Sequence, residues 1–360
     1  MSNILADLDA LSQFSTETLR AAGADAASAN AASKAMLHAS RMGVDSHGVR
    51  LLPHYDKVLR GGRVNGSPRL SFERKRAGSG ILDADHGHGA LAAYTACEHA
   101  CTLAREAGIG AVGIRRSSHF GPAGAYALAM AEAGMIGIVM CNSDSFVRLH
   151  DGAERFHGTN PISVAAPNPS GQPWLLDMAT SAVPYNRVQL YKSLGCDLPE
   201  RTASDAQGID TLDPNNVEML APVGGEFDFK GAGLAGVVEI FSALLTGMKT
   251  SSEILSMPGP DISTPRDMGA FVFCIDPDGF IGRDIMMAGM ERYLAALRAS
   301  AARTGERVMA PGDREWAEAE RRRTQGVPID PETAAEFKRL AKSAGIPTPF
   351  HDTEQASGMV

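Results

Sequence analysis

The chain has 360 residues, of which 44% are hydrophobic and 21% are charged, a composition typical of globular rather than disordered proteins. This length predicts two or three packed lobes. The net charge of −8 argues against a nucleic-acid or anionic-membrane partner. We expect no signal peptide and no membrane span, because no apolar run reaches about 20 residues. The five cysteines, mostly in apolar context, indicate a reduced, cytoplasmic protein.

The N-terminal and middle parts of the chain predict a helical start followed by an α/β region. Apolar spacing and alanine-rich sequence predict helices over the first 60 residues, and residues 69–83 are typical of a strand. The middle then alternates between strands and helices. We expect further strands at 109–114, 136–141 and 271–275, short apolar runs at 161–167 and 174–178, and helices at 90–107, 123–133 and 234–245.

The C-terminal part predicts helices again. Residues 192–223, rich in Asp, Asn, Pro and Gly, predict a loop, and 283–303 predict a helix. A last helix should begin after Asp330 as N-cap and stop at Gly345. The two helical ends should pack together as one lobe around a central mixed α/β region. The expected divisions are 1–75 for the N-terminal part of that lobe, 76–280 for the cofactor and substrate region, and 281–360 for the returning helices.

Three local patterns suggest sites that the sequence itself argues against. Residues 108–113 (Gly-Ile-Gly-Ala-Val-Gly) match the dinucleotide-binding fingerprint, but a helix precedes them and the segment is itself the expected strand, so a Rossmann turn is disfavoured. Cys97, His99 and Cys101 could form a metal site, although they do not share one helical face and core packing is favoured. The basic run 321–323 follows several glutamates and predicts a solvated, ion-paired face.

Two histidines flanked by glycine are the strongest candidates for acid–base chemistry. His47 lies in Asp45-Ser46-His47-Gly48-Val49-Arg50, close to Tyr55, and His119 lies in the segment Ser117–Gly121. An imidazole has an unperturbed pKa of about 6.5, which suits proton transfer near neutral pH. Either pattern alone is more often an ordinary loop, but their recurrence favours an active site.

Polar clusters with small residues follow several of the expected strands or open helices. Polar side chains at such positions commonly contact ligands in α/β sheets, and a cation with open amides at a helix start suits an anion. The clusters are 142–145 (Asn-Ser-Asp-Ser), 158–161 (Gly-Thr-Asn-Pro), 177–181 (Asp-Met-Ala-Thr-Ser), 230–233 (Lys-Gly-Ala-Gly) and 311–313 (Pro-Gly-Asp).

Taken together, these segments resemble the malate/L-lactate dehydrogenase family whose members lack a Rossmann fold. The family includes ureidoglycolate, sulfolactate and diketogulonate oxidoreductases and a piperideine-2-carboxylate reductase. The resemblance spans nearly the whole chain in order. Its matching segments are Asp45-Ser46-His47-Gly48-Val49, Ser118-His119-Phe120-Gly121, Gly158-Thr159-Asn160-Pro161, Asp177-Met178-Ala179-Thr180-Ser181, Phe229-Lys230-Gly231, Phe273-Cys274-Ile275-Asp276-Pro277 and Pro311-Gly312-Asp313.

The resemblance implies a distinctive α/β fold, a homodimer and a nicotinamide cofactor, NAD or alternatively NADP. It implies that His47 and His119 are the acid–base candidates, with Ser46 and Asp144 beside them in the catalytic set and Tyr55 in the substrate pocket. The residues implied to hold the cofactor are Ser143, Asp177, Met178, Ala179, Thr180, Lys230, Pro311 and Gly312.

Four departures from the family pattern bear on the substrate. Many members carry a pocket arginine where this chain has Leu51, and many have Asn where it has Ser118. The segments 150–152 (His-Asp-Gly) and 184–187 (Pro-Tyr-Asn-Arg) also differ from the usual family sequence. We therefore expect the cofactor class to follow the family and the substrate to be specific to this chain.

The expected reaction is hydride transfer between the nicotinamide and a small 2-hydroxy or 2-oxo acid, with a histidine moving the proton. An arginine can grip the substrate carboxylate through two parallel hydrogen bonds; Arg50 is the first hypothesis for this clamp and Arg187 the second. NADPH-dependent reduction of a cyclic imino acid and a ureidoglycolate-type dehydrogenase remain alternatives. A metal-dependent hydrolase using His47, His119 and Asp144 is a remote one, since His86 and His88 form the only close histidine pair.

Overall fold

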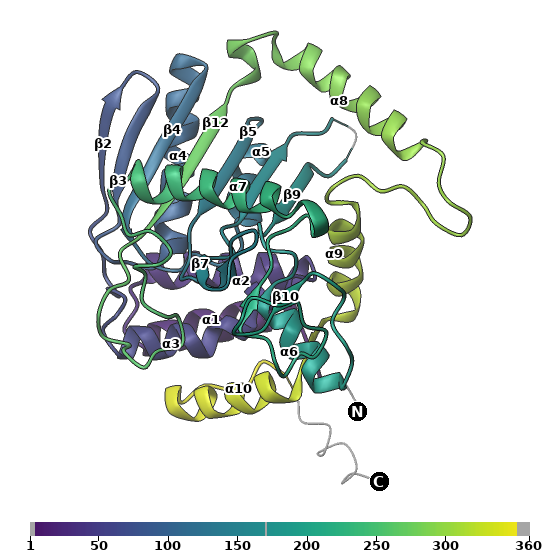
Figure 1. Cartoon of the computed structure of the whole chain (residues 1–360). Helices are drawn as coiled ribbons and strands as arrows, with labels where there is room; N and C mark the ends of the chain where they lie inside the picture. Colours follow the sequence, from purple (N-terminus) through teal and green to yellow (C-terminus); the bar gives the residue numbers. More distant parts are fainter. Residues whose placement is uncertain (1–3, 170, 351–360) are drawn as a thin grey trace, which may run out of the picture.

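The computed structural model describes residues 4–169 and 171–350. Its centre is a seven-stranded mixed sheet (Figure 1), in which β3 and β4 pair in parallel and all other neighbours are antiparallel. In spatial order the strands are β2 (Ser71–Arg76), β3 (Ser79–Asp83), β4 (Ile109–Ser117), β12 (Met268–Ile275), β5 (Ile136–Cys141), β8 (Ile162–Ala166) and β9 (Trp174–Met178).

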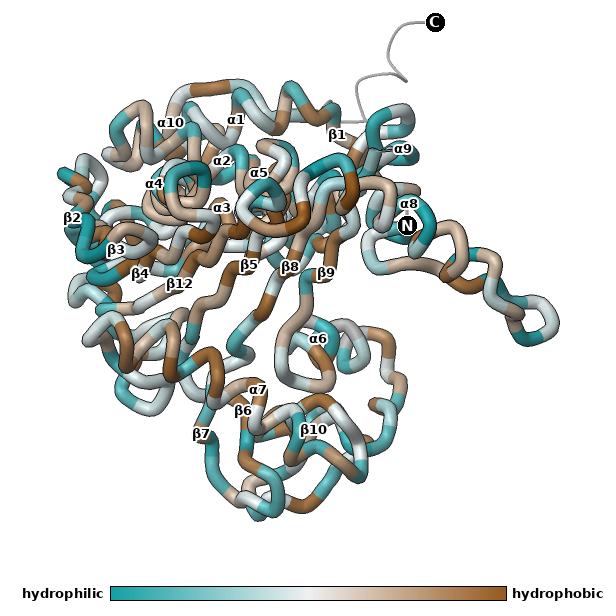
Figure 2. Tube along the Cα trace, turned by 90° about the horizontal axis from the view of Figure 1, so that it is seen from above, coloured by the Kyte–Doolittle hydropathy of each residue, from teal (hydrophilic) through white to brown (hydrophobic). Residues whose placement is uncertain are grey.

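Helices cover both faces of this sheet. On one face lie α4 (Gly89–Ala107) and α5 (Gly124–Glu132), and on the other lies α7 (Phe229–Glu239), which continues into a π-helical turn (Ile240–Leu244) (Figure 2). The central strand β12 is therefore buried on both faces, and its Val272 pairs with Val112 and Val139. Such burial explains the nearly continuous apolar sequence of β12.

Both ends of the chain form one helical lobe, as predicted. β1 (Ile4–Ala6) pairs with β13 (Val327–Ile329), and the rings of Phe14 and Phe337 lie 5.1 Å apart. The last helix begins after Asp330, whose carboxylate accepts a hydrogen bond from the Thr333 amide at 3.1 Å, and it ends at Gly345 as expected. The helices of the lobe are α1 (Leu8–Ala21), α2 (Ala26–Arg41), α3 (Leu52–Arg60) and α10 (Pro331–Ala344).

A small lobe lies beside the sheet on the face that carries α7 (Figure 2). The prediction of a loop over 192–223 is wrong in part, because β10, β11 and the end of α6 lie there around a small core containing Val147 and Leu220. Strands of two residues have no period that a sequence can reveal. The elements are α6 (Tyr185–Leu194), β6 (Val147–Arg148), β7 (Arg155–His157), β10 (Ala203–Ser204) and β11 (Met219–Leu220).

The helix α8 (Arg283–Arg298) extends away from the body before the chain returns to α9 (Asp313–Gln325) (Figure 1). Within α8 only Leu294 is buried. The predicted end of this helix, at 303, is too late. Short single-turn helices occupy Gly225–Phe227 and Pro277–Gly279.

The remaining differences from the sequence prediction are local. Residues 69–83 form two strands in a hairpin rather than one strand, and α7 begins at Phe229 rather than at 234. The glycine-rich segment 108–113 ends α4 and enters β4, so it is not a dinucleotide turn, as predicted. Within residues 4–169 and 171–350, no helix is long and apolar enough to cross a membrane.

Candidate active site

The His47 segment is a pair of short 3-10 turns, Asp45–His47 and Val49–Leu51, between α2 and α3. Arg322 of α9 reaches it from the far end of the chain and donates hydrogen bonds to the Asp45 carboxylate at 2.9 Å and to the Ser40 carbonyl at 2.7 Å. The predicted solvated face at 321–323 is thus wrong for Arg322, which is buried. The basic run therefore includes a residue that fixes the turn carrying His47.

The structure brings together four of the predicted site residues. The rings of His47 and His119 are stacked with centroids 5.9 Å apart. The Ser46 hydroxyl lies 2.9 Å from Nδ1 of His47, and the Tyr55 hydroxyl lies 2.8 Å from Nδ1 of His119. Each hydroxyl fixes its imidazole at Nδ1, so Nε2 is the nitrogen that can exchange a proton with a substrate.

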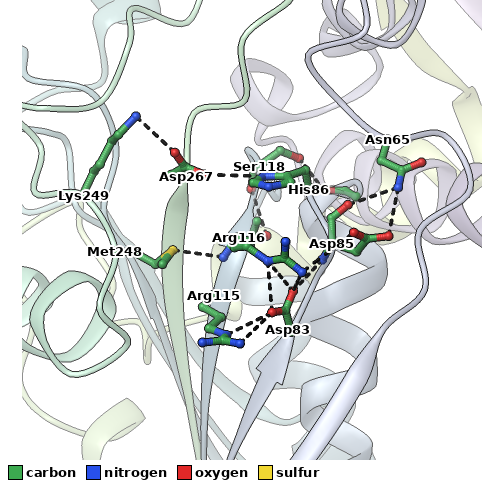
Figure 3. A network of polar contacts seen from close by, with 12 residues as sticks. Asn65, Asp83, Asp85, His86, Arg115, Arg116, Ser118, Met248, Lys249 and Asp267 are labelled. Atoms are coloured by element: carbon green, nitrogen blue, oxygen red, sulfur yellow. Dashed lines mark hydrogen bonds and ion pairs between the residues drawn. The ribbon is translucent and has the colours of Figure 1, made fainter.

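A polar network fixes the end of β4, directly before His119 in the chain (Figure 3). The Ser118 hydroxyl donates to the Gly87 carbonyl and accepts from the Gly89 amide, both at 3.0 Å. Just before it, Arg116 has a positive φ of 50° and bonds the Asp83 carboxylate at 2.8 Å. A non-glycine residue in this region is strained, and such strain persists where surrounding contacts enforce it.

Burial keeps both histidines neutral at rest. It lowers the pKa of His47 to about 4. The pKa of His119 is lowered first by burial and then by repulsion of its protonated form by protonated His47 and by Arg266. Burial also raises the pKa of Tyr55, whose hydroxyl therefore orients His119 without adding charge. At neutral pH either imidazole can accept a proton from a substrate hydroxyl.

The other predicted pocket residues lie apart from this pair. Arg50 is half exposed and faces the start of α10, where its guanidinium is 3.5 Å from Asp330 and 3.8 Å from Glu332. Arg187 is exposed on α6 in the small lobe. Asp144 accepts a hydrogen bond from the Met257 amide at 3.0 Å and pairs with the buried Arg266. The predicted clamp, Arg50, is therefore directed at α10.

Two of the predicted cofactor residues, Ser143 and Thr180, meet Thr159 beyond the ends of β5 and β9, and we call these three residues the cofactor ridge. The Ser143 hydroxyl accepts a hydrogen bond from the Thr159 amide at 3.2 Å, and the Thr159 carbonyl accepts one from the Thr180 amide at 2.9 Å. Gly158 lies so close to Ser143 that a Cβ would overlap the Ser143 hydroxyl and carbonyl oxygens. The glycine is needed for this close approach.

Three further contacts involve the other predicted cofactor residues. The Asp177 carboxylate accepts from the Gly124 amide, the first residue of α5, at 2.9 Å. The Pro311 carbonyl, beside Gly312, accepts from the Leu175 amide at 3.3 Å. Gly231, which follows the exposed Lys230, packs on Val223, and the Val223 amide bonds the Thr180 carbonyl at 2.8 Å. Hydroxyls, backbone amides and the Lys230 cation are groups that suit a dinucleotide, but these contacts place Pro311 at the start of β9 and Thr180 beyond its end.

Among residues 4–169 and 171–350, no group of three or more His, Cys, Asp and Glu side chains is placed so that it could hold a metal ion. His99 stacks on Phe72, with ring centroids 3.9 Å apart. Cys97 and Cys101 are buried in the core, and the Cys101 sulfur lies 3.7 Å from that of Cys274. These cysteines therefore pack in the core, as the sequence favoured.

Comparison with known proteins decides the family. The model of the malate/L-lactate dehydrogenase family matches residues 6–338. The chain belongs to this family. It is 33% identical to malate dehydrogenase of Pyrococcus abyssi, over 94% of each chain, and 32% identical to a Delta(1)-pyrroline-2-carboxylate reductase of Pseudomonas fluorescens, over 91% of this chain and 95% of that protein. The structure of malate dehydrogenase from Pyrococcus horikoshii matches with a TM-score of 0.88, 30% identity and coverage of 96% and 97%.

Membership makes the chain an oxidoreductase of the NAD(P)-dependent malate/L-lactate dehydrogenase family, with the fold that the resemblance implied. The structure also adds residues to the site that the sequence analysis missed. His88 packs edge-on against Tyr55, with ring centroids 4.3 Å apart. His54 also lies near, and after burial the charges of Arg266 and Arg63 contribute to lowering its pKa. No local motif marks these residues, because they meet only in the folded chain.

Proposed function

We propose that the chain interconverts a small 2-hydroxy acid and its 2-oxo acid with NAD or NADP, using His47 and His119 as the acid–base pair. The observation that carries the proposal is the stacked pair itself, with each Nδ1 held by a hydroxyl. Asp144, which was also placed in the catalytic set, has no part in proton transfer in this proposal, because its carboxylate is engaged by Arg266 and by the Met257 amide.

The residues of the chain have separate tasks in this proposal. In the oxidising direction a neutral imidazole accepts the hydroxyl proton at Nε2, and in the reducing direction the imidazolium returns it to the carbonyl oxygen. Ser46 and Tyr55 keep the two rings oriented through Nδ1. Ser143, Asp177–Thr180, Lys230 and Pro311–Gly312 would hold the cofactor. When bound, the nicotinamide exchanges a hydride with the substrate carbon.

The test is the absorbance decay of NADH, and separately NADPH, with oxaloacetate, pyruvate, bulkier 2-oxo acids and piperideine-2-carboxylate. We expect turnover with at least one 2-oxo acid, and the same series determines the preferred cofactor. If no substrate of the panel causes a decay of NADH or NADPH absorbance, and titration detects no cofactor binding, the proposal is refuted.

A second candidate is reduction of a cyclic imino acid. It is favoured by the 32% identity to the pyrroline-2-carboxylate reductase, nearly equal to the identity with the malate dehydrogenase. If NADH or NADPH absorbance decays only with piperideine-2-carboxylate, this second function is favoured. Ureidoglycolate belongs in the same panel, assayed in the oxidising direction.

We also propose a cytoplasmic homodimer. Leu234, Val237, Ile240 and Leu244 recur at helical spacing and are exposed on α7 and its extension, and α8 exposes Ile285 and Tyr293. Exposed apolar stripes of this kind usually mark an interface. The proposal of a cytoplasmic compartment is supported by the free thiols of the cysteines, which are buried except for that of Cys196.

A Val237→Glu/Leu244→Glu double variant should sediment as a monomer at concentrations where the wild-type chain is a dimer, because each glutamate would be buried unpaired in the interface. Sedimentation velocity measures the change. Ile209→Glu, at an exposed apolar residue of the small lobe, is the matched control and should leave the dimer intact. A monomeric wild-type chain would contradict the proposal.

A further inference from the structure

Two buried arginines lie under the segment 255–257. Arg63 is 2% exposed and Arg266 is 3% exposed. Arg266 Nε donates to the Leu255 carbonyl at 2.8 Å, while Arg63 Nη1 donates to the carbonyls of Ser256 and Met257 at 3.2 and 2.9 Å. These contacts leave much of both guanidinium groups unused.

The unused donors indicate a missing anion. Nε and Nη2 of Arg63 and Nη1 of Arg266 are buried and have no hydrogen-bond partner within the described residues. A guanidinium stays charged in proteins, so burial without partners is unfavourable. Asp144 bonds Arg266, and the charges of Asp261 and Asp144 both act on Arg63, although the exposed Asp261 carboxylate is hydrogen-bonded to Ser263 and Thr264. Neither carboxylate bonds the three unused donors, so these donors are open to a further carboxylate.

The arginine pair lies close to the proton-transfer residues. The positive charge of Arg266 adds to burial in lowering the pKa of His119 and of His54. Asp144, which holds Arg266, directly follows Ser143 of the cofactor ridge. A surface pocket of about 650 Å³ nearby is lined in part by His54 and Pro258, but not by either arginine. An anion at Arg266 would therefore lie close to His119 and to the segment that carries Ser143.

This chain also needs a cation that its sequence motif does not supply. Leu51 stands where many family members have the pocket arginine, and Arg50 faces Asp330 and Glu332 of α10. Since the carboxylate of a 2-hydroxy acid must be fixed for hydride transfer, another guanidinium has to take this place.

We propose that Arg266, supported by Arg63, binds the substrate carboxylate, and that Asp144 positions Arg266. The inference rests on the proposed function and deepens it, because it defines the substrate as a small acid with one carboxylate at this subsite. Arg266 is then a substrate-binding residue, and Asp144 acts through it.

The test compares Arg266→Gln, Arg266→Lys and Arg63→Gln with the wild-type chain, using the best 2-oxo acid of the panel. We expect Arg266→Gln to raise KM by about 10–100-fold while the Kd of the nicotinamide cofactor changes by less than about 2-fold. Arg266→Lys keeps the positive charge but lacks the two parallel N–H donors of a guanidinium, so its KM should lie between those of the wild-type chain and Arg266→Gln. Arg323→Gln, which removes an exposed ion pair with Glu320, is the matched control and should leave KM unchanged.

A binding readout keeps this test separate from that of the proposed function. Oxalate, a small carboxylate probe, is titrated calorimetrically into the protein saturated with NADH or NADPH. We expect oxalate to bind the wild-type chain and to lose at least about 10-fold in affinity in Arg266→Gln. If no substrate of the panel is turned over but oxalate binds Arg266→Gln more weakly than the wild-type chain, the reaction is misassigned and the carboxylate subsite is supported. Equal oxalate affinity in both proteins, or no binding to the wild-type chain, overturns the subsite, and unchanged cofactor affinity verifies that the variants fold.

Discussion

A His119→Ala variant should lower kcat for the best 2-oxo acid by about 10²–10⁴-fold, the range expected when a general acid–base group is removed. His47→Ala should cause a smaller loss. The reason for the difference is electrostatic: the charge of Arg266 acts on His119, whereas burial alone accounts for the shift of His47. If Arg266 binds the substrate carboxylate, the reacting oxygen lies nearer to His119.

The orientation of His119 provides an internal check. Tyr55→Phe removes the hydroxyl that lies 2.8 Å from Nδ1 but keeps the ring that packs on His88. We expect a moderate fall in kcat, of about 10-fold, with KM little changed. His99→Ala, at a ring stacked on Phe72 away from the pair, is the control for a histidine substitution. Near-wild-type turnover in both His47→Ala and His119→Ala would refute the assignment, and a larger loss in His47→Ala would exchange the two roles.

The sequence predicted the parts of the fold in which local signals agree. The last helix has an aspartate cap, a proline in the first turn, an apolar stripe and a glycine stop, and all four lie where expected. The strand at Ile136–Cys141 was likewise predicted to the residue, because it is a compact apolar run between turn signals. The small lobe was missed since its two-residue strands carry no periodic pattern.

The site was only partly predictable for a similar reason. His47, His119, Ser46 and Tyr55 could be named because each lies within or near a short motif that resembles the family. The contact between Asp144 and Arg266 joins residues more than a hundred positions apart, as do those between Arg322 and Asp45. Arg50 was a reasonable hypothesis from its position beside the motif, but the fold turns its side chain toward α10.

Acid should destabilise the protein before carboxylate protonation dominates. Burial lowers the pKa of His47 and His54 to about 4 and that of His88 to about 3, and charged neighbours contribute at His54 and His88. In the unfolded chain these groups titrate near 6.5. The unfolded state therefore binds more protons below pH 6.5, so stability is fully present above that pH and falls as the pH drops toward 3–4. For His88, which is 3% exposed, this difference in pKa between the unfolded and folded states would lower the free energy of unfolding by about 4–5 kcal/mol once the pH is below both pKa values.

The measurement is the free energy of unfolding in urea from pH 7.5 to 4.5. His88 caps α4, where its Nδ1 accepts a hydrogen bond from the Ala90 amide at 3.1 Å. His88→Asn keeps a side-chain acceptor at the cap but does not titrate, so its stability should fall less steeply below pH 6.5 than that of the wild-type chain. Equal slopes for the two proteins would mean that His88 does not stay neutral on folding. A wild-type curve without any decline between pH 6.5 and 4.5 would contradict the neutral state of the whole histidine cluster, and with it the premise that His47 and His119 rest as bases.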